Sequence, residues 1–238
     1  MNTDDVRTYD LIVSLGENCA AAFQLRYRNM RLFSLPFDWV YIEDEKPVEY
    51  LCEGFTNDFK NLALKENLKR VEGNEAHSVI YQDMYSGYFF PNHFRENAEK
   101  EYNVFNQKLR RRINRLLQKI RSAHKVLFIL STAFPFDTAS LKKLSSCLTG
   151  LYPNVHFDFE VVSFGCLREE EKTDGNIHLK HYIRQQNLYD FYKTNFEWAF
   201  LDQIKLSTKS RDKITLLSIK AFGKRFRLNF EIRRNYNV

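Results

Sequence analysis

The sequence has no uninterrupted apolar segment long enough to cross a membrane. No apolar run reaches the roughly 18 to 20 residues that a membrane-spanning helix needs. Residues 1–5 are acidic where a secretory signal is basic, and no apolar segment with a small-residue cleavage site follows them. We therefore expect a cytoplasmic protein.

Cysteine is scarce and scattered. The four cysteines form neither a CxxC pair nor the dense framework of a disulfide-rich secreted domain. They are Cys19, Cys52, Cys147 and Cys166. We expect them to be reduced thiols.

Several cofactor and metal motifs are also missing. The sequence contains no HExxH, no GxxxxGK[ST] and no GxGxxG, so zinc-protease, P-loop and dinucleotide-binding functions lack support. His178 and His181 form a pair, but three residues apart on a strand they would face opposite sides, which argues against a shared metal. We predict no cofactor and no metal site.

Apolar residues, in contrast, are plentiful enough for a substantial core. They make up 44% of the 238 residues, aromatic residues make up 15% and charged residues 28%. Nothing in this composition indicates disorder. The length suits one α/β domain with insertions.

The order of apolar patterns predicts an α/β fold. A buried run at 10–16 ends in glycine and precedes helix-forming residues at 20–26, which is the opening unit of a doubly wound sheet. Further on, apolar spacings of three and four predict a long helix at 96–124. The remaining predictions are strands at 125–131, 155–163 and 177–183, helices within 47–65 and at 137–151, and strands or loops at 71–94. We expect a mainly parallel sheet flanked by helices in a Rossmann/flavodoxin-like, three-layer arrangement.

The positive charge is concentrated at the C-terminus. Residues 205–238 hold ten Lys or Arg against two acidic residues, so residues 1–204 are slightly negative within a total of +6. We therefore divide the chain into an α/β domain at 1–204 and a basic amphipathic extension at 205–238. Its segment 213–234 could lie on an anionic membrane surface, or pack on the domain or on a partner subunit. Nucleic acid is a weaker expectation because no reading motif accompanies the charge. The oligomeric state stays open.

A second basic cluster lies on the long predicted helix. The cluster comprises Arg110, Arg111, Arg112 and Arg115, and the apolar stripe of the same helix is expected to face the core. A solvated surface is the ordinary interpretation. Binding of an anionic ligand, such as a phosphate or a uronate sugar, is the sharper alternative.

The candidate reactive centre follows the first predicted strand. In open α/β sheets, ligands bind beyond the carboxyl ends of the strands. Cys19 comes at such an end and at the start of a helix, where the helix dipole favours a thiolate. Ser14, Gly16 and Asn18 belong to the same segment, and Ser131 lies at the end of the strand at 125–131. The loops that leave these two strand ends would meet if the strands are neighbours.

A nucleophilic thiol needs a base and an orienting group. His93 lies in an aromatic loop beside a proline, and Asp38 lies in the segment Pro-Phe-Asp-Trp. Each residue also has an ordinary structural interpretation. Cys19 could be a small buried residue at a helix start, His93 a hydrogen-bonded structural group, and Asp38 a turn cap.

The segments Ser14-Leu-Gly-Glu-Asn-Cys19 and Pro36-Phe-Asp-Trp39 resemble a bacterial family of unknown function called "putative papain-like cysteine peptidase". His93-Phe94, the Arg-rich helix and the strand at 126–130 also resemble it, over roughly residues 8–200. The resemblance implies a Cys-then-His order, carried here by Cys19 and His93. The loop is similar as well to the nucleophile loop of flavodoxin-like or SGNH-type esterases, which act on esters and glycan acyl groups.

Our leading hypothesis is a thiol-dependent hydrolase or acyltransferase acting on a small-molecule, glycan or peptide substrate. Cys19 would be the nucleophile, His93 the general base and Asp38 the orienting acid, and Asn18, Gly16, Ser14 and Ser131 would bind substrate or stabilise the oxyanion. The rival hypothesis is a non-catalytic, carbohydrate- or envelope-associated binding protein whose basic tail touches the inner membrane.

Overall fold

The fold is taken from a computed structural model of the 238-residue chain. It describes residues 6–16, 18–42, 47–72, 79–91, 93–132, 138–166, 168–183, 198–207, 214–221 and 224–230. Within these ranges, only the backbone is considered for residues 47, 165–166, 214–221 and 224–230.

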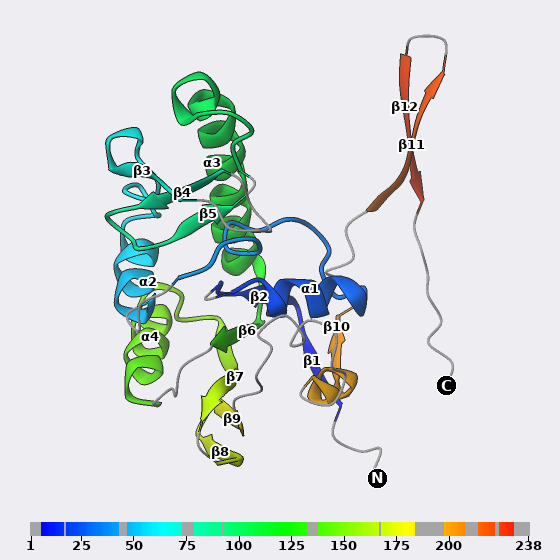
Figure 1. Ribbon diagram of the computed structural model, residues 1–238. Helices are drawn as coiled ribbons and strands as arrows, with labels where there is room; N and C mark the ends of the chain where they lie inside the picture. The colour runs from blue at the N-terminus through cyan, green and yellow to red at the C-terminus, as the bar shows by residue number, and fades with distance from the viewer. Residues whose placement is uncertain are drawn as a thin grey trace.

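A five-stranded, mostly parallel sheet forms the centre of the fold (Figure 1). Its strands, in spatial order, are β2 (Leu11–Ser14), β6 (Lys125–Thr132), β7 (His156–Cys166), β9 (Ile177–Ile183) and β8 (Glu170–Asp174). The first four run parallel to one another, and β8 pairs with β9 in the antiparallel sense. The mainly parallel sheet predicted from the sequence is therefore confirmed. The edge strand β8 was not predicted, because its side chains are polar and mostly exposed.

Helices cover both faces of this sheet, as expected for parallel strands. Alternate residues of the strands belong to two separate apolar clusters, one on each face of the sheet. In the first cluster, Val13 and Phe128 pack with α2 (Pro47–Thr56), α3 (Ala98–Ser122) and α4 (Thr138–Leu151). Ile12 and Ile129 pack with α1 (Ala20–Tyr27). The sequence thus predicted an α/β fold with flanking helices correctly, and the more specific Rossmann/flavodoxin-like layout stays a prediction.

The long helix α3 confirms the periodicity seen in the sequence. Asn97 caps its N-terminus by accepting a hydrogen bond from the backbone N–H of Lys100 at 3.0 Å. Its apolar stripe is buried, at Phe105, Leu109, Ile113, Leu116, Leu117 and Ile120. The stripe fixes which face of α3 the basic side chains occupy.

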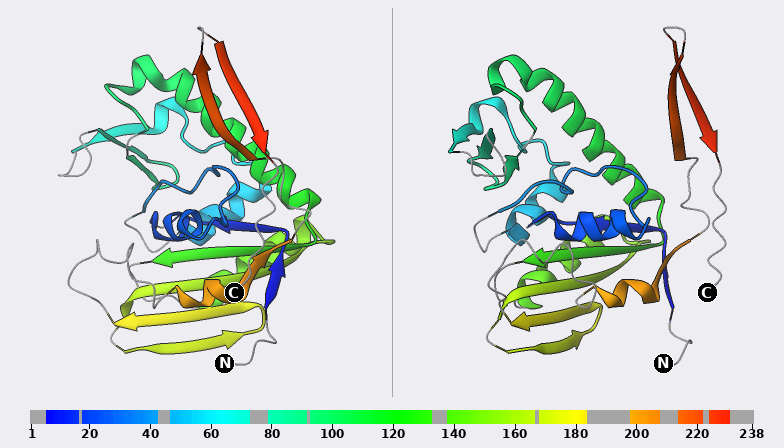
Figure 2. Two further views of the ribbon diagram at one scale, coloured as in Figure 1. Left: turned by 90° about the vertical axis from the view of Figure 1, so that its right-hand side faces the viewer. Right: turned by 45° about the vertical axis from the view of Figure 1, so that its right-hand side comes forward.

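A parallel strand pair lies over the face that α1 also covers (Figure 2). It joins β1 (Arg7–Tyr9) to β10 (Ile204–Leu206), which follows the short helix η3 (Ala199–Gln203). Strand β10 crosses the boundary at 204/205 that we drew from charge alone. The N- and C-terminal parts of the α/β fold therefore meet in one hydrogen-bonded pair.

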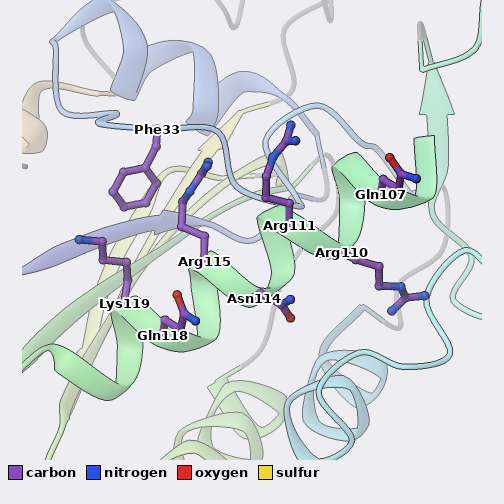
Figure 3. Close-up of a pocket in the computed structure, with 8 residues that line it drawn as sticks. All are labelled: Phe33, Gln107, Arg110, Arg111, Asn114, Arg115, Gln118 and Lys119. Carbon is purple, nitrogen blue, oxygen red and sulfur yellow. The ribbon is translucent and has the colours of Figure 1, made fainter. Parts of the chain in front are cut away.

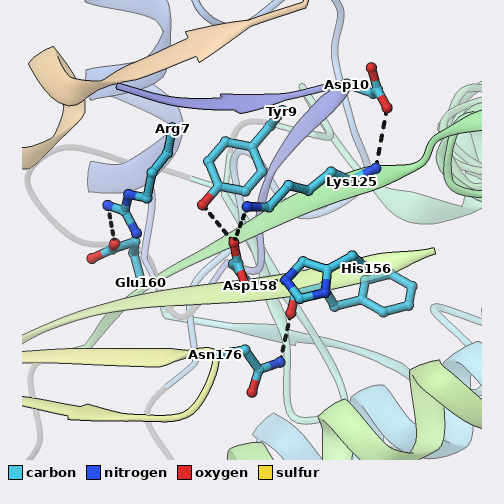
Figure 4. Close-up of polar contacts among 9 residues, drawn as sticks. Arg7, Tyr9, Asp10, Lys125, His156, Asp158, Glu160 and Asn176 are labelled. Carbon is cyan, nitrogen blue, oxygen red and sulfur yellow. Dashed lines mark hydrogen bonds and ion pairs between the residues drawn. The ribbon is translucent and has the colours of Figure 1, made fainter. Parts of the chain in front are cut away.

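Polar contacts attach β1 to the central sheet (Figure 4). Tyr9 Oη donates to Asp158 Oδ2 at 2.7 Å, and Lys125 Nζ lies 3.0 Å from the same oxygen. Arg7 Nη2 donates to Glu160 Oε1 at 2.6 Å. Burial raises the pKa of Glu160, while the charge and hydrogen bond of Arg7 lower it. The side chain of Glu160 is only 1% exposed, so its charge depends on Arg7.

We expect Arg7→Met to lower the free energy of unfolding by about 2 to 3 kcal/mol, because it leaves the buried Glu160 carboxylate without its cation. The double variant Arg7→Met/Glu160→Met should recover most of this loss. Urea unfolding of the two variants and the wild type measures both effects. Equal stability of Arg7→Met and the wild type would contradict this role of the ion pair.

A small antiparallel sheet lies beside the central one (Figure 1). Its strands are β3 (Leu68–Val71), β4 (Ile80–Asp83) and β5 (Phe89–Pro91), and the short helix η1 (Lys65–Asn67) precedes β3. The sequence predicted strands or loops here without their pairing. The sheet positions the segment that carries His93.

The basic extension contains a β-hairpin. Strands β11 (Ile214–Ala221) and β12 (Lys224–Phe230) pair in the antiparallel sense. Contact of segment 213–234 with a membrane surface stays a prediction. Within the described ranges, no helix combines the length and apolarity needed to span a bilayer.

Candidate functional site

Cys19 lies where the first parallel strand turns into the first helix. Strand β2 ends at Ser14, and Cys19 is the N-cap residue of α1. Its side chain is half-buried and carries a thiol. First-turn N–H groups of a helix lack partners within the helix, and together with the helix dipole they favour negative charge at this position.

Asn18 ties this turn to the end of the neighbouring strand. Its Nδ2 donates to the carbonyl oxygen of Ser131 at 2.9 Å, and its Oδ1 accepts from the backbone N–H of Ala20 at 2.9 Å. Because β2 and β6 are adjacent, the segment that follows β2 contacts the C-terminal end of β6, which was expected if these strands were neighbours. One side chain therefore fixes both the helix start and its distance from β6.

A buried serine lies at the end of each of these two strands. Ser14 and Ser131 are buried, and within the described part of the chain their Oγ atoms have no hydrogen-bond partner. By strand alternation, they lie on the sheet face of Ile12 and Ile129, which α1 covers. A buried hydroxyl without a partner is costly, so both can serve a bound polar group.

Gly16 lets the turn approach the segment Pro36-Phe-Asp-Trp39. Its φ is +68°, a region that favours glycine, and a Cβ built there would lie 2.8 Å from Phe37 Cβ and clash with Phe37 O. The loop that carries Cys19 is therefore packed directly against the loop that carries Asp38.

We expect Gly16→Ala to cost more than about 2 kcal/mol of stability, because the strained φ and the clash with Phe37 backbone add together. Gly175→Ala is the matched control, since Gly175 has a φ of +63° and nothing within 4 Å of its added Cβ. That control should cost only about 1 kcal/mol. Thermal or urea unfolding gives both values, and equal losses would contradict the close approach.

Asp38 holds its own loop together. It is 2% exposed, and its Oδ2 accepts from Arg31 Nε at 2.8 Å and from the Leu35 N–H at 2.8 Å. Burial raises the pKa of Asp38, and the charge of Arg31 opposes this shift. Asp38 and Arg31 also line, with Ser14, a small cavity behind strand β2. Arg31 was not among the site residues predicted from the sequence, although its charge, opposite to that of Asp38 in the same aromatic segment, could have indicated it.

His93 is held among aromatic rings. It packs edge-to-face with Phe90 and Phe105, at centroid distances of 5.5 and 5.7 Å. Its Nε2 lies 3.3 Å from the carbonyl oxygen of Trp39. Burial, reinforced by the charge of Arg112, lowers the pKa of His93 to about 4. The imidazole is therefore neutral at pH 7.

The predicted site residues are only partly joined. Asn18 and Ser131 are hydrogen-bonded, Gly16 packs on Phe37, and His93 contacts the residue that follows Asp38. Among the described residues, no hydrogen bond joins His93 to Asp38 or to Cys19. The orienting group on the imidazole is the Trp39 carbonyl, while the Asp38 carboxylate is occupied by Arg31.

The histidine pair weighed as a weak metal site lies on β9. His178 Nδ1 is 3.2 Å from Thr173 Oγ1 of the neighbouring strand β8. The described part of the chain contains no group of three or more His, Cys, Asp or Glu that could hold a metal ion.

The fold and this site define a class of protein: an α/β domain with a cysteine at the helix start that follows its first parallel strand. A family model described as "Putative papain-like cysteine peptidase" matches residues 10–168, about two thirds of the chain. The chain belongs to this family. The matched range includes Cys19, Asp38, His93 and Ser131.

One relative among curated proteins is an uncharacterized protein, R408, of Acanthamoeba polyphaga mimivirus. It is 26% identical over 161 residues, which cover 60% of this chain and 72% of the relative. No solved structure matches the chain. Because this relative is viral, the bacterial origin suggested by the sequence stays a prediction.

Proposed function

We propose that the protein is a thiol-dependent hydrolase or acyltransferase in which Cys19 is the nucleophile. The observation that carries the proposal is the position of Cys19: a half-buried thiol at the N-cap of α1, beyond the carboxyl end of β2. Membership of the cysteine peptidase family supports the same chemistry. Helix N-termini stabilise thiolates and developing oxyanions.

His93 is the proposed general base. Its neutral form is the one that can accept a proton, and a pKa of about 4 keeps it neutral at pH 7. Because that pKa also makes it a weak base, the proposal requires substrate binding to raise the pKa of His93. If Nε2–H donates to Trp39 O, Nδ1 is the nitrogen left to accept the thiol proton. The proposal requires Nδ1 to come within hydrogen-bond reach of Cys19 Sγ when substrate is bound.

Asp38 contributes as a positioning residue. Through Arg31 and the Leu35 N–H it fixes the segment whose next carbonyl, that of Trp39, contacts His93. Asn18, Gly16 and the hydroxyls of Ser14 and Ser131 are proposed to shape the oxyanion and substrate site. Among the described residues the two hydroxyls have no hydrogen-bond partner, which supports this role.

In the proposed reaction the Cys19 sulfur attacks an acyl carbon while His93 accepts the thiol proton. Collapse of the tetrahedral intermediate breaks the bond to the leaving group, which takes the proton from His93 and leaves a thioester on Cys19. Attack by water, or by an acceptor hydroxyl or amine, then releases the acyl group and restores the thiol. The proposed substrates are esters or amides of small molecules, glycans or peptides. We propose that the protein acts on them in the cytoplasm, in association with polysaccharide.

Alkylation of the intact protein by iodoacetamide at pH 7 tests the proposal. Peptide mass spectrometry should show Cys19 modified at least about 10-fold faster than Cys52 and Cys147, because the proposed base His93 assists its reaction, whereas burial raises the pKa of Cys52. His93→Gln should slow the modification of Cys19 and leave the other two cysteines unchanged. Equal, slow modification of all the thiols would favour the non-catalytic binding protein.

A further inference from the structure

A shallow basic pocket lies along the exposed side of α3 (Figure 3). Its volume is about 690 Å³. It is lined by Phe33, Gln107, Arg110, Arg111, Asn114, Arg115, Gln118 and Lys119. The lining has four cationic side chains, three amides and no acidic residue.

Three of the cations form a row. Arg111, Arg115 and Lys119 follow one another at intervals of four residues, so they lie on one stripe of α3, with roughly 6 Å of helix rise between neighbours. Arg111 and Arg115 project from the same side of the helix, with Arg115 beside Phe33, whereas Arg110 projects away from them (Figure 3). The three positive charges of the row are spread over about two turns of the helix. A single small anion is too short to contact all of them.

Two of the cationic side chains in the pocket are held in place by contacts within the protein. Arg115 Nη1 donates to Ser34 O at 3.0 Å, and its guanidinium lies 5.5 Å from the Phe33 ring centroid. Lys119 Nζ lies 5.6 Å from the same centroid. These contacts position two of the cations before any ligand arrives, which reduces the entropy lost on binding.

The three arginines of the pocket have few acidic partners among the described residues. Asp38 is the nearby buried acid, and it is hydrogen-bonded to Arg31. Burial lowers the pKa of the adjacent Arg112, and repulsion from Arg31, Arg111 and Arg115 adds to this, against the attraction of Asp38. Within the described ranges, no ion pair involves Arg110, Arg111 or Arg115. Crowded cations of this kind gain stability from a bound anion.

The lining favours a carbohydrate over a nucleic acid. Amides of Gln107, Asn114 and Gln118 suit hydroxyl groups, and single-stranded nucleic acids need an aromatic platform for base stacking. The pocket's aromatic ring, Phe33, is already covered by Arg115 and Lys119.

From this geometry we infer that the basic pocket binds an acidic glycan, with sugar carboxylates on the row Arg111–Arg115–Lys119 and hydroxyls on the neighbouring amides. The inference goes beyond the proposed thiol chemistry and does not depend on Cys19.

Isothermal titration of the full chain with an oligogalacturonate tests this inference. We expect the acid form to bind saturably. Its methyl ester, which has the same hydroxyls without the charge, should bind with at least about 10-fold lower affinity. Arg111→Gln should weaken binding about 10-fold, because a carboxylate loses its guanidinium partner. Since Arg111 is exposed, this variant should fold normally.

Arg121→Gln is the matched control. It removes one arginine from the same helix, at a position where the side chain is exposed and paired with Asp58 at 3.3 Å. Its affinity should stay within about 2-fold of wild type. The inference would be overturned if both variants lost affinity equally, or if the methyl ester bound as tightly as the acid form. It would also be overturned by tighter binding of pyrophosphate or of a single-stranded RNA oligomer, or by no binding at all.

Discussion

Cys19→Ala is expected to abolish acyl hydrolysis, with a loss of at least about 10³-fold in kcat/KM on an activated thioester or p-nitrophenyl ester. The expected loss is large because the sulfur forms the covalent intermediate, and alanine offers no nucleophile in its place. Unfolding in urea should be nearly unchanged, since the side chain is small and only half-buried. The comparison of hydrolysis and stability separates loss of chemistry from loss of fold.

Cys52→Ala is the control for that experiment. Burial, reinforced by the neighbouring Cys147, raises the pKa of Cys52 to about 11, so its thiol stays protonated near neutrality. Cys147 Sγ lies 3.6 Å from Cys52 O, between helices α2 and α4. Hydrolysis should survive Cys52→Ala. If instead Cys52→Ala removed the activity and Cys19→Ala retained it, the nucleophile would be misassigned.

His93→Phe should remove a strong pH dependence of stability. In the wild type the folded-state pKa of His93 is lowered to about 4, against about 6.5 in an unfolded chain. The unfolded state therefore binds more protons between these values, and stability falls as the pH falls from 6.5 toward 4. The loss is on the order of 2 to 3 kcal/mol. Phenylalanine keeps the packing on Phe90 and Phe105 without a titrating group.

Urea unfolding at pH 7.5 and 4.5 measures this effect. The difference between the two pH values should be smaller in His93→Phe than in the wild type by about 2 kcal/mol. The same histidine predicts that wild-type hydrolysis falls at acid pH as His93 becomes protonated, because a protonated imidazole cannot act as a base. An unchanged pH slope in His93→Phe would contradict the burial of a neutral imidazole.

Elements with strong apolar periodicity were predictable from the sequence. Strand β6 is buried almost throughout, and α3 carries an uninterrupted apolar stripe, so both were predicted within a few residues. The pair β1–β10 was not predictable, since two three-residue strands almost 200 residues apart carry no local signal. Their partnership depends on tertiary contacts such as Tyr9–Asp158.

The candidate site also has a part that could be predicted from the sequence and a part that could not. The closeness of the segment after β2 to the end of β6 followed from strand order, and Asn18 provides the contact through the Ser131 carbonyl oxygen. The partners of Asp38 and His93 did not follow, because spacing along the chain does not say which of several nearby polar groups a side chain reaches. Asp38 is bonded to Arg31 rather than to the imidazole, and the Trp39 backbone carbonyl is the imidazole's acceptor.

The central claim is that Cys19 forms a covalent acyl intermediate. Intact-mass and peptide mass spectrometry of the wild-type protein, quenched during turnover of an activated acyl donor, tests it most directly. We predict one acyl adduct per chain, located on Cys19 and absent from Cys19→Ala. Turnover with no adduct on Cys19, or an adduct that persists in Cys19→Ala, would contradict the claim.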